Sequence, residues 1–310
     1  MGVRVDADTA ATHRLVQTKR AEDMVFGVIG IVALVIVMGL LVTLVVDLLS
    51  DGIGRISPEF LTSFPSRKAA EAGVLSAWIG TTLVMIVTAF IAVPLGVGAG
   101  LYLEEYASKN MLTDAIEINV SNLAGVPSII YGLLALGFFV YGLNMGQTIL
   151  VGGLVLALLI LPIVIVATRE ALRAVPSGLR ESAYGIGANR WQVMWSYILP
   201  SARPGILTGA IVGLSRAIGE TAPIITIGAL TYIAFLPPAP LSATAPWISF
   251  DWLNSPFTVM PIQMFNWISR PQAAFHINAA ATGALLLGMT LLMNGFAIYL
   301  RYRLRRLVRT

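Results

Sequence analysis

Long apolar runs separated by short polar segments dominate the chain and predict membrane-spanning helices. A helix needs about 20 mostly apolar residues to cross about 30 Å of hydrocarbon, where it satisfies its own backbone hydrogen bonds. No segment alternates apolar and polar residues as a barrel strand does. We expect six spans, at about residues 25–46, 74–102, 120–143, 148–168, 205–235 and 277–300. The chain is therefore predicted to be an all-α polytopic membrane protein.

Glycine and proline interrupt two of the predicted spans. In the third span, Gly125, Pro127 and Gly132 are expected to serve mainly close helix packing, although they can also bend the helix. In that case Ser128 and Tyr131 would line a pathway. In the fifth span, Gly219 and Pro223 are expected to break the helix and free backbone groups toward a cavity. The four-residue polar turn 144–147 makes the third and fourth spans a tight antiparallel hairpin.

Composition supports a membrane protein and excludes several kinds of chemistry. Hydrophobic residues make up 57% of the chain and charged residues 12%, whereas soluble proteins have about 25% charged residues. The absence of cysteine excludes disulfides, thiolate metal sites and cysteine nucleophiles. The two histidines, His13 and His276, are too far apart to form a metal site on one helix, so no metal site is expected.

The distribution of basic residues predicts the orientation of the spans. Fifteen of the 20 Lys and Arg residues lie in the N-terminal tail 1–24, the loop after the second span, the loop 169–204 and the region from Arg301 onward. This positive-inside bias places both termini in the cytoplasm. The integral domain is expected to cover residues 25–302, with an uncleaved first span and a basic tail at 303–310. The net charge of +4 thus follows from topology and needs no nucleic acid.

The sequence offers little for catalysis. None of the three lysines stands in a GxxxxGK[ST] setting that would cradle nucleotide phosphates, so we expect no nucleotide site in this chain. An intramembrane enzyme would need an ionisable dyad facing a cavity, and only the fifth span carries clear charges. We therefore predict that the chain is not an enzyme.

The loop 169–204 is too polar to be a span and too patterned to be a simple connector. One short helix is expected after Pro176, ending at Gly185 and Gly187. A second is expected to start near Asn189 and to stop at Leu199 and Pro200. Their amphipathic faces suit docking into a cleft of a partner, although an ordinary amphipathic loop helix is the simpler alternative.

The spacing of six residues in this loop resembles the EAA motif of ABC importer permeases. The matching residues are Glu181, Ser182, Ala183, Gly187, Leu199 and Pro200. Ser182 replaces the first alanine of the motif, and Tyr197 stands where isoleucine is usual. The resemblance implies the type I (MetI-like) permease fold and a coupling helix that docks on a dimer of ATPase subunits. Those partners would bind ATP and Mg, and this chain would hold no cofactor.

Three further segments resemble permease subunits of phosphate importers, of the PstA type. They are residues 125–132 (GVPSIIYG), 216–223 (RAIGETAP) and 260–267 (MPIQMFNW). The resemblance implies import of inorganic phosphate across the bacterial inner membrane. It also implies a second permease (PstC-type), ATP-binding subunits (PstB-type) and an extracytoplasmic phosphate-binding protein (PstS-type). Sulfate or molybdate permeases and secondary anion transporters remain alternatives.

Arg216 and Glu220 are the expected centre of the translocation pathway, together with Thr221. The spacing i, i+4 places both charges on one helix face, and Arg216 lies about 16 Å beyond the cytoplasmic end of the fifth span. An arginine presents a planar fork of donors that suits phosphate. The alternative is a structural ion pair that locks this helix to a neighbour.

Overall fold

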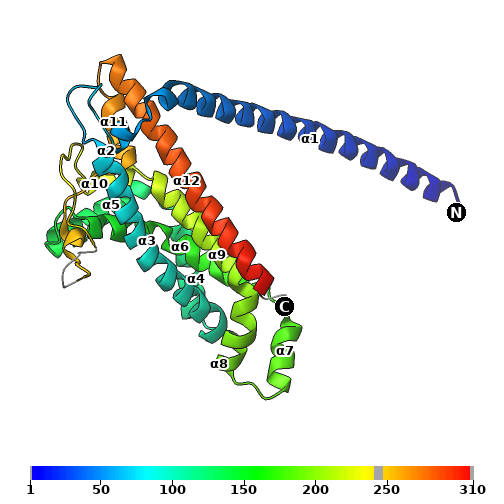
Figure 1. Ribbon diagram of the computed structural model, residues 1–310. Helices are drawn as coiled ribbons and strands as arrows, with labels where there is room; N and C mark the ends of the chain where they lie inside the picture. The colour runs from blue at the N-terminus through cyan, green and yellow to red at the C-terminus, as the bar shows by residue number, and fades with distance from the viewer. Residues whose placement is uncertain (1, 241–246, 308–310) are drawn as a thin grey trace. The chain divides into compact units, whose positions relative to one another are not determined.

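The computed structural model describes the backbone of residues 2–240 and 247–307, and the side chains of residues 19–20, 22–240 and 247–303. The predicted tail residues 308–310 and the side chain of His13 therefore lie outside the described part. Two compact units divide the chain, residues 1–51 and 52–310. The described residues are mostly helical and contain no strand, which confirms the all-α fold class (Figure 1).

The first unit is a single helix. Helix α1 (Gly2–Gly52) includes the predicted first span and continues without a break through the predicted N-terminal tail. The stretch Glu22–Arg55 is long and apolar enough to cross a membrane. Its side chains from Met24 to Val46 are almost all exposed within this chain, as expected for a helix whose solvent is lipid.

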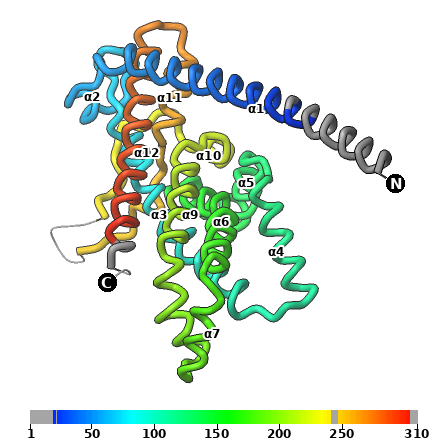
Figure 2. The backbone as a smooth tube through the Cα atoms, turned by 90° about the vertical axis from the view of Figure 1, so that its right-hand side faces the viewer, coloured from blue at the N-terminus to red at the C-terminus, as the bar shows by residue number. Residues whose placement is uncertain are grey.

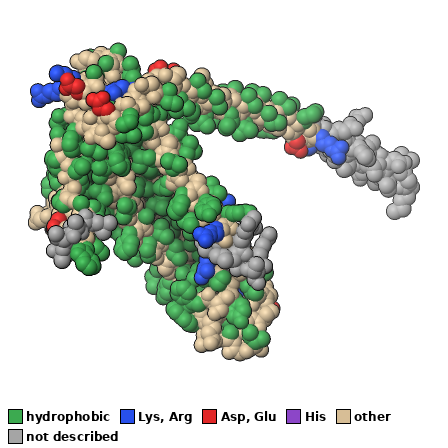
Figure 3. Space-filling model, in the orientation of Figure 1, with side chains coloured by type: hydrophobic (Ala, Val, Ile, Leu, Met, Phe, Trp, Pro, Cys, Tyr) green, Lys and Arg blue, Asp and Glu red, His purple; other side chains and the backbone are tan. Residues whose placement is uncertain are grey.

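Four long helices form the body of the second unit. They are α3 (Leu75–Leu101), α6 (Ile149–Arg173), α9 (Leu199–Gly219) and α12 (Ala273–Leu307). Helix α6 packs between α3 and α9, and α12 packs along α9. The face shown in Figure 3 is covered by hydrophobic side chains along these helices, with charged side chains mainly toward the ends of the unit. This distribution fits helices embedded in lipid.

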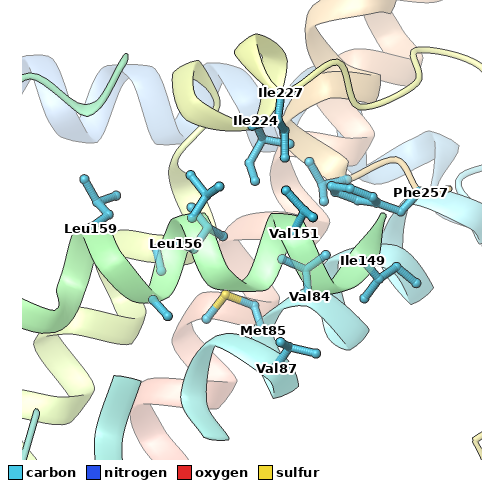
Figure 4. Packing of buried hydrophobic residues seen from close by; sticks show 14 of the residues in the cluster. Val84, Met85, Val87, Ile149, Val151, Leu156, Leu159, Ile224, Ile227 and Phe257 are labelled. Carbon is cyan, nitrogen blue, oxygen red and sulfur yellow. The ribbon is translucent and has the colours of Figure 1, made fainter. Parts of the chain in front are cut away.

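Helix α6 lies at the centre of the main core. In Figure 4, Val84 and Met85 of α3 point toward Val151 and Leu156 of α6, with Ile224 approaching from above. Small residues allow the close approach, because a Cβ on Gly96 or Gly153 would collide with side chains of the facing helix. The core therefore depends on glycines at the helix contacts as well as on large apolar side chains, as is common among membrane helices.

The number of described helices that are long and apolar enough to cross a membrane is lower than the six predicted spans. Among the described residues, four helices are long and apolar enough to cross a membrane, or up to five if one bent pair counts as a single span. The sequence predicts six spans, whereas this criterion of helix length and hydropathy finds fewer candidates in the described part of the chain. The third and fifth predicted spans account for the difference.

The third predicted span, 120–143, is not one continuous helix. Helix α4 (Met111–Leu123) ends before Gly125, and α5 (Ser128–Ala135) continues into the π-helical η3 (Leu136–Gly142). The two arms differ in direction by 105°, and Figure 2 shows the sharp turn between α4 and α5. Pro127 explains the break, because its ring removes a helical N–H and disfavours a helical conformation in the residue before it.

The fifth predicted span, 205–235, is also shorter as a helix. Helix α9 ends at Gly219, a short helix α10 (Ala222–Thr226) follows, and irregular backbone continues to the outer loop. The helix therefore ends at Gly219, where the sequence predicts a break, and Pro223 lies in the first turn of α10. Helix α9 is not among the apolar spans, and it carries Arg203 and Arg216.

The predicted loop 169–204 contains helix α7 (Ser177–Gly185), the short α8 (Arg190–Gln192) and the π-helical η4 (Val193–Ile198). The prediction that Leu199 and Pro200 stop the second loop helix is wrong, because α8, η4 and α9 follow one another without a break. Pro200 stands in the first turn of α9, where a missing N–H is tolerated.

The opposite end of the second unit holds the remaining short elements. These are η1 (Ile53–Arg55), α2 (Pro58–Thr62), η5 (Asp251–Asn254) and α11 (Met260–Ile268), while η2 (Tyr102–Tyr106) closes α3 near α7. Arg55 ties this end together by donating to Asn278 Oδ1 of α12 at 2.9 Å and to Ala70 O at 2.7 Å. The unit therefore has two distinct ends, one with α7 and one with α2 and α11.

Candidate translocation and coupling sites

Arg216 and Glu220 form the predicted ion pair across the end of helix α9. The Arg216 Nε donates to Glu220 Oε1 at 3.1 Å. Arg216 lies in the last turn of α9, while Glu220 follows the helix with extended dihedrals (φ −77°, ψ 121°). A cation is favoured in the last turn, where the helix dipole is negative. The pair therefore marks the helix break itself rather than the middle of a regular span.

This pair is only partly enclosed. The side chain of Arg216 is 39% exposed and that of Glu220 is 19% exposed. Among the described residues, Glu220 is the one hydrogen-bond partner of the Arg216 guanidinium, although the group has five N–H donors. The unused N–H groups of a partly open guanidinium can donate to the oxygens of a planar or tetrahedral oxyanion.

The segments 125–132 and 216–223 lie in contact. Gly132 of α5 packs directly against Pro223 and the hydroxyl of Thr226 in α10, leaving no room for a Cβ. The Tyr131 hydroxyl donates to Leu123 O at 2.8 Å across the bend, which fixes the angle between α4 and α5. Gly132 therefore lies at a close contact between α5 and α10, where a glycine is needed.

The other predicted pathway residues are placed differently. Gly125 and Pro127 are exposed in the bend, and Ser128 is half-buried at the start of α5. A Cβ on Gly125 would meet only Asn122 O at 3.5 Å, so no other described helix of this chain packs closely against this glycine. Gly125 and Pro127 form the bend between α4 and α5.

Thr221 and Gly219 line a groove of about 480 Å³ beside the helix break. Its other walls include Pro261 and Phe265 of α11 and Leu286 of α12. The segment 260–267 therefore meets the segment 216–223 at this groove. All three segments that carry the resemblance are thus grouped around α10.

The coupling residues lie at the opposite end of the unit. Glu181 is exposed, and no hydrogen bond or ion pair of its side chain is found among the described residues. The Ser182 hydroxyl donates to Gly178 O at 2.7 Å within α7, and Ala183 is buried against the loop core. The serine is therefore accommodated at the alanine position of the motif.

Gly187 ends helix α7 in a left-handed conformation. Its φ is +85°, and the N–H groups of Ala188 and Gly187 bond to Ala183 O at 3.2 Å and to Tyr184 O at 2.9 Å. This is a Schellman cap, in which glycine avoids the penalty that other residues meet at positive φ. The motif glycine thus has a defined structural role.

A cluster of large apolar side chains is exposed on this loop. Ile186 is exposed, and the rings of Trp191 and Trp195 lie 5.1 Å apart with both side chains exposed. The Asn189 side chain accepts from Gln192 N and the Gln192 side chain from Asn189 N, which fixes the start of α8. Exposed apolar groups on a firmly capped loop are typical of a docking surface.

A cluster of charges lies next to this loop and is not among the features predicted from the sequence. In the sequence Arg169, Arg173 and Arg180 indicate only the orientation of the spans, whereas the structure pairs them with Glu104 and Glu105 of η2 and with Glu117 of α4. The available signal was the acidic pair at the end of a span that otherwise has no charge. Among the described residues, no group of three or more His, Asp or Glu is arranged to hold a metal.

Comparison with known proteins gives the class of protein. The family described as "Binding-protein-dependent transport system inner membrane component" matches residues 92–306. The chain belongs to this family, so it is a permease subunit of an ABC importer and a multi-pass membrane protein. It is a transporter component rather than an enzyme.

Several individual permeases are similar to this chain over most of its length. A probable ABC transporter permease, YqgI of Bacillus subtilis, is 34% identical over 230 residues, covering 74% of this chain and 78% of its own. The phosphate transport system permease protein PstA of Pasteurella multocida is 32% identical over 254 residues, covering 81% and 84%. PstA of Yersinia pestis is 29% identical over 297 residues, covering 94% of both chains.

Solved structures confirm the fold. The inward-facing MetNI methionine ABC transporter matches with a TM-score of 0.55 at 18% identity, over 73% of this chain and 93% of the matched chain. The permease fold predicted from the coupling loop is therefore confirmed.

Proposed function

We propose that this permease imports inorganic phosphate, driven by ATP that partner subunits hydrolyse. The observation that carries the proposal is the Arg216–Glu220 pair at the break between α9 and α10. It is an ion pair with unused guanidinium donors, grouped with the segments that resemble phosphate permeases. The similarity to PstA proteins over most of the chain supports the same substrate.

Arg216 acts as a transient anion site. Its five donors can hold a phosphate by two parallel hydrogen bonds, and its charge persists when water is partly excluded. Glu220 shares the guanidinium at 3.1 Å and neutralises it between transport events. A site that released the bound phosphate slowly would limit the rate of transport. Partial compensation of the Arg216 charge by Glu220 favours release.

The coupling loop is the part of this chain that the ATPase subunits move. ATP binding closes a dimer of ATPase subunits, and the loop from Glu181 to Gly187 follows that movement. Only an interaction that differs between the two states can drive a conformational change. The docked loop, and not the anion site, is therefore the point of energy input. Helices α6 and α9 flank the loop in sequence. Their movement then changes the side of the membrane to which the translocation pathway is open.

The complex required for this activity has four kinds of component. A second, homologous permease completes the pathway, two ATPase subunits supply ATP and Mg sites, and an extracytoplasmic protein delivers phosphate. The bacterial inner membrane is the location that such an assembly requires. This chain contributes no nucleotide site in the proposed scheme.

Transport by the reconstituted complex tests the substrate. Proteoliposomes with ATP inside should accumulate labelled phosphate when the binding protein is supplied outside, and unlabelled sulfate or molybdate should not compete. Preferential uptake of sulfate or molybdate would reject phosphate as the substrate and retain the ABC permease class. Uptake that persists without ATP, driven by an ion gradient, would reject the proposed energy source.

A further inference from the structure

The charged cluster near η2 links the coupling loop to the bent third span. We propose that Glu104, Glu105, Glu117, Arg169 and Arg180 are positioning residues that transmit movement of α7 to α4. The proposal rests on the proposed function, because α7 is the element on which the ATPase subunits would act. It concerns contacts within this chain that are separate from the docking surface.

The first link joins α7 to the end of α3. Arg180 of α7 contacts Glu105 Oε1 through Nη2 at 2.7 Å and donates from the same nitrogen to Leu172 O at 2.9 Å. The side chain of Glu105 is 15% exposed. A charge so enclosed is costly to leave unpaired. Movement of α7 therefore either moves η2 along with it or breaks this pair.

The second link passes through the neighbouring residue Glu104. Its carboxylate accepts from Arg169 Nε at 3.3 Å and from Arg173 Nε at 2.9 Å, both on α6. Glu104 and Glu105 are adjacent in η2, so a shift transmitted to one displaces the other. The side chain of Arg169 is 7% exposed, which makes this the most enclosed arginine of the cluster.

The third link reaches α4. Arg169 Nη2 lies 2.5 Å from Glu117 Oε1, so one buried guanidinium bridges carboxylates of η2 and α4. Helix α4 has no buried residue of its own, and a cavity of about 320 Å³ lies between Glu117, Ser121 and Asn122 on α4 and Arg169 on α6. Within this chain the ion pair, and not apolar packing, sets the position of α4 at this end.

From α4 the connection continues to the anion site. Helix α4 leads through the bend into α5, where Gly132 packs against Pro223 and Thr226 of α10. Residue Pro223 lies three positions after Glu220, the partner of Arg216. Each step from α7 to Arg216 is therefore an ion pair, a covalent connection or a close packing contact. Contact alone does not establish coupling, so the test must measure movement.

The natural absence of cysteine allows a direct measurement of α4. Ser121→Cys places a thiol in the cavity beside Arg169, and its rate of labelling by a water-soluble maleimide reports the opening of that cavity. In the full reconstituted complex, we expect this rate to change when a non-hydrolysable ATP analogue binds. Adding Glu105→Gln or Glu117→Gln should abolish the change. Transport per ATP hydrolysed should fall about tenfold, which corresponds to about 1.4 kcal/mol.

Rescue and a matched control distinguish coupling from stability. Exchanging the pair, with Glu105→Arg and Arg180→Glu together, should restore the labelling change above that of either single variant. Arg203→Gln is the control, since Arg203 is exposed near the same end and has no hydrogen bond or ion pair among the described residues. Copurification of all subunits is checked first for every variant.

The outcomes separate the two proposals. An unchanged labelling response and unchanged transport per ATP in both glutamine variants would overturn the positioning role. Loss of assembly in both would assign the cluster a purely structural role and would overturn it equally. If the unaltered complex transports a different anion, only the proposed substrate fails, because the labelling response to the ATP analogue still reports the connection.

Discussion

The two groups of charges in this protein are enclosed to different degrees. At the α7 end, Arg169 is almost fully buried and contacts two carboxylates, Glu104 and Glu117. At the break after α9, Arg216 is more than a third exposed, and Glu220 is its one ion-pair partner in the part of the chain that the structure describes. The first group pairs its charges inside the chain, whereas the second leaves more than a third of its arginine side chain open to an outside partner.

This difference indicates where an outside partner can act. A buried charge that already has its partners gains nothing from an added anion and loses much if a partner is removed. A partly open guanidinium with one partner can exchange that partner at moderate cost. The buried group is therefore suited to holding helices in position, and the open pair is suited to a transient ligand.

Removing Arg169 should have the largest effect of the predicted changes. A small effect would contradict the difference between the buried and the open group of charges. Arg169→Met keeps a long apolar side chain but leaves Glu104 and Glu117 without their shared partner. We expect a loss of about 3–5 kcal/mol of stability, as found when one partner of a buried pair is removed. The thermal unfolding temperature of the purified complex measures this loss. An unfolding temperature equal to that of the unaltered complex would mean that the cluster does not hold α4.

Removing Arg216 should affect transport rather than stability. Arg216→Gln retains a hydrogen-bond donor but loses the charge, and phosphate uptake should fall about 10- to 100-fold, as expected for a charged hydrogen bond worth about 1.5–3 kcal/mol. Uptake by a complex of normal composition and unfolding temperature is the measurement. Normal uptake in such a complex would remove Arg216 from the pathway. A large drop in stability would support the alternative of a structural ion pair.

The sequence predicted local features of both regions well. The i, i+4 spacing of Arg216 and Glu220, the break near Gly219, and the start of α7 after Pro176 all depend on residues close together in the chain. Each of these follows from backbone preferences or helix periodicity, which a single sequence displays.

The features that the sequence did not predict depend on tertiary contacts or on helix context. Arg169 and Glu104 are 65 residues apart, so nothing local indicates that they meet. Pro200 was expected to end a helix, but in the first turn of α9 it ends nothing. The sequence allows a bend at Gly125 and Pro127, but its angle of 105° depends on contacts between α4 and α5 such as that of the Tyr131 hydroxyl with Leu123 O.

Gly132 offers a way to disturb the connection between the two regions without altering any charge. A Cβ there would collide with Pro223 and Thr226, so Gly132→Ala should cost about 1–3 kcal/mol by overpacking and should lower phosphate uptake. Gly137→Ala is the matched control in the next element, because a Cβ at Gly137 meets nothing within 4 Å. Equal unfolding temperatures and equal uptake in the two variants would show that α10 does not rely on this contact.

Gly187 gives the smallest expected change and tests whether the docking loop belongs to the rigid, charge-paired region. With φ at +85°, Gly187→Ala should cost about 1–2 kcal/mol for a left-handed residue, and it should loosen the Schellman cap that ends α7. Gly185→Ala is the control, since Gly185 lies in α7 with open space around it and alanine favours a helix. Arg180 anchors α7 through Glu105 independently of this cap, so the Gly187 variant should still assemble while transporting less phosphate per ATP. If both glycine variants transported equally well, the geometry of the α7 end would be irrelevant to coupling, and the buried charges would have to position the loop without it.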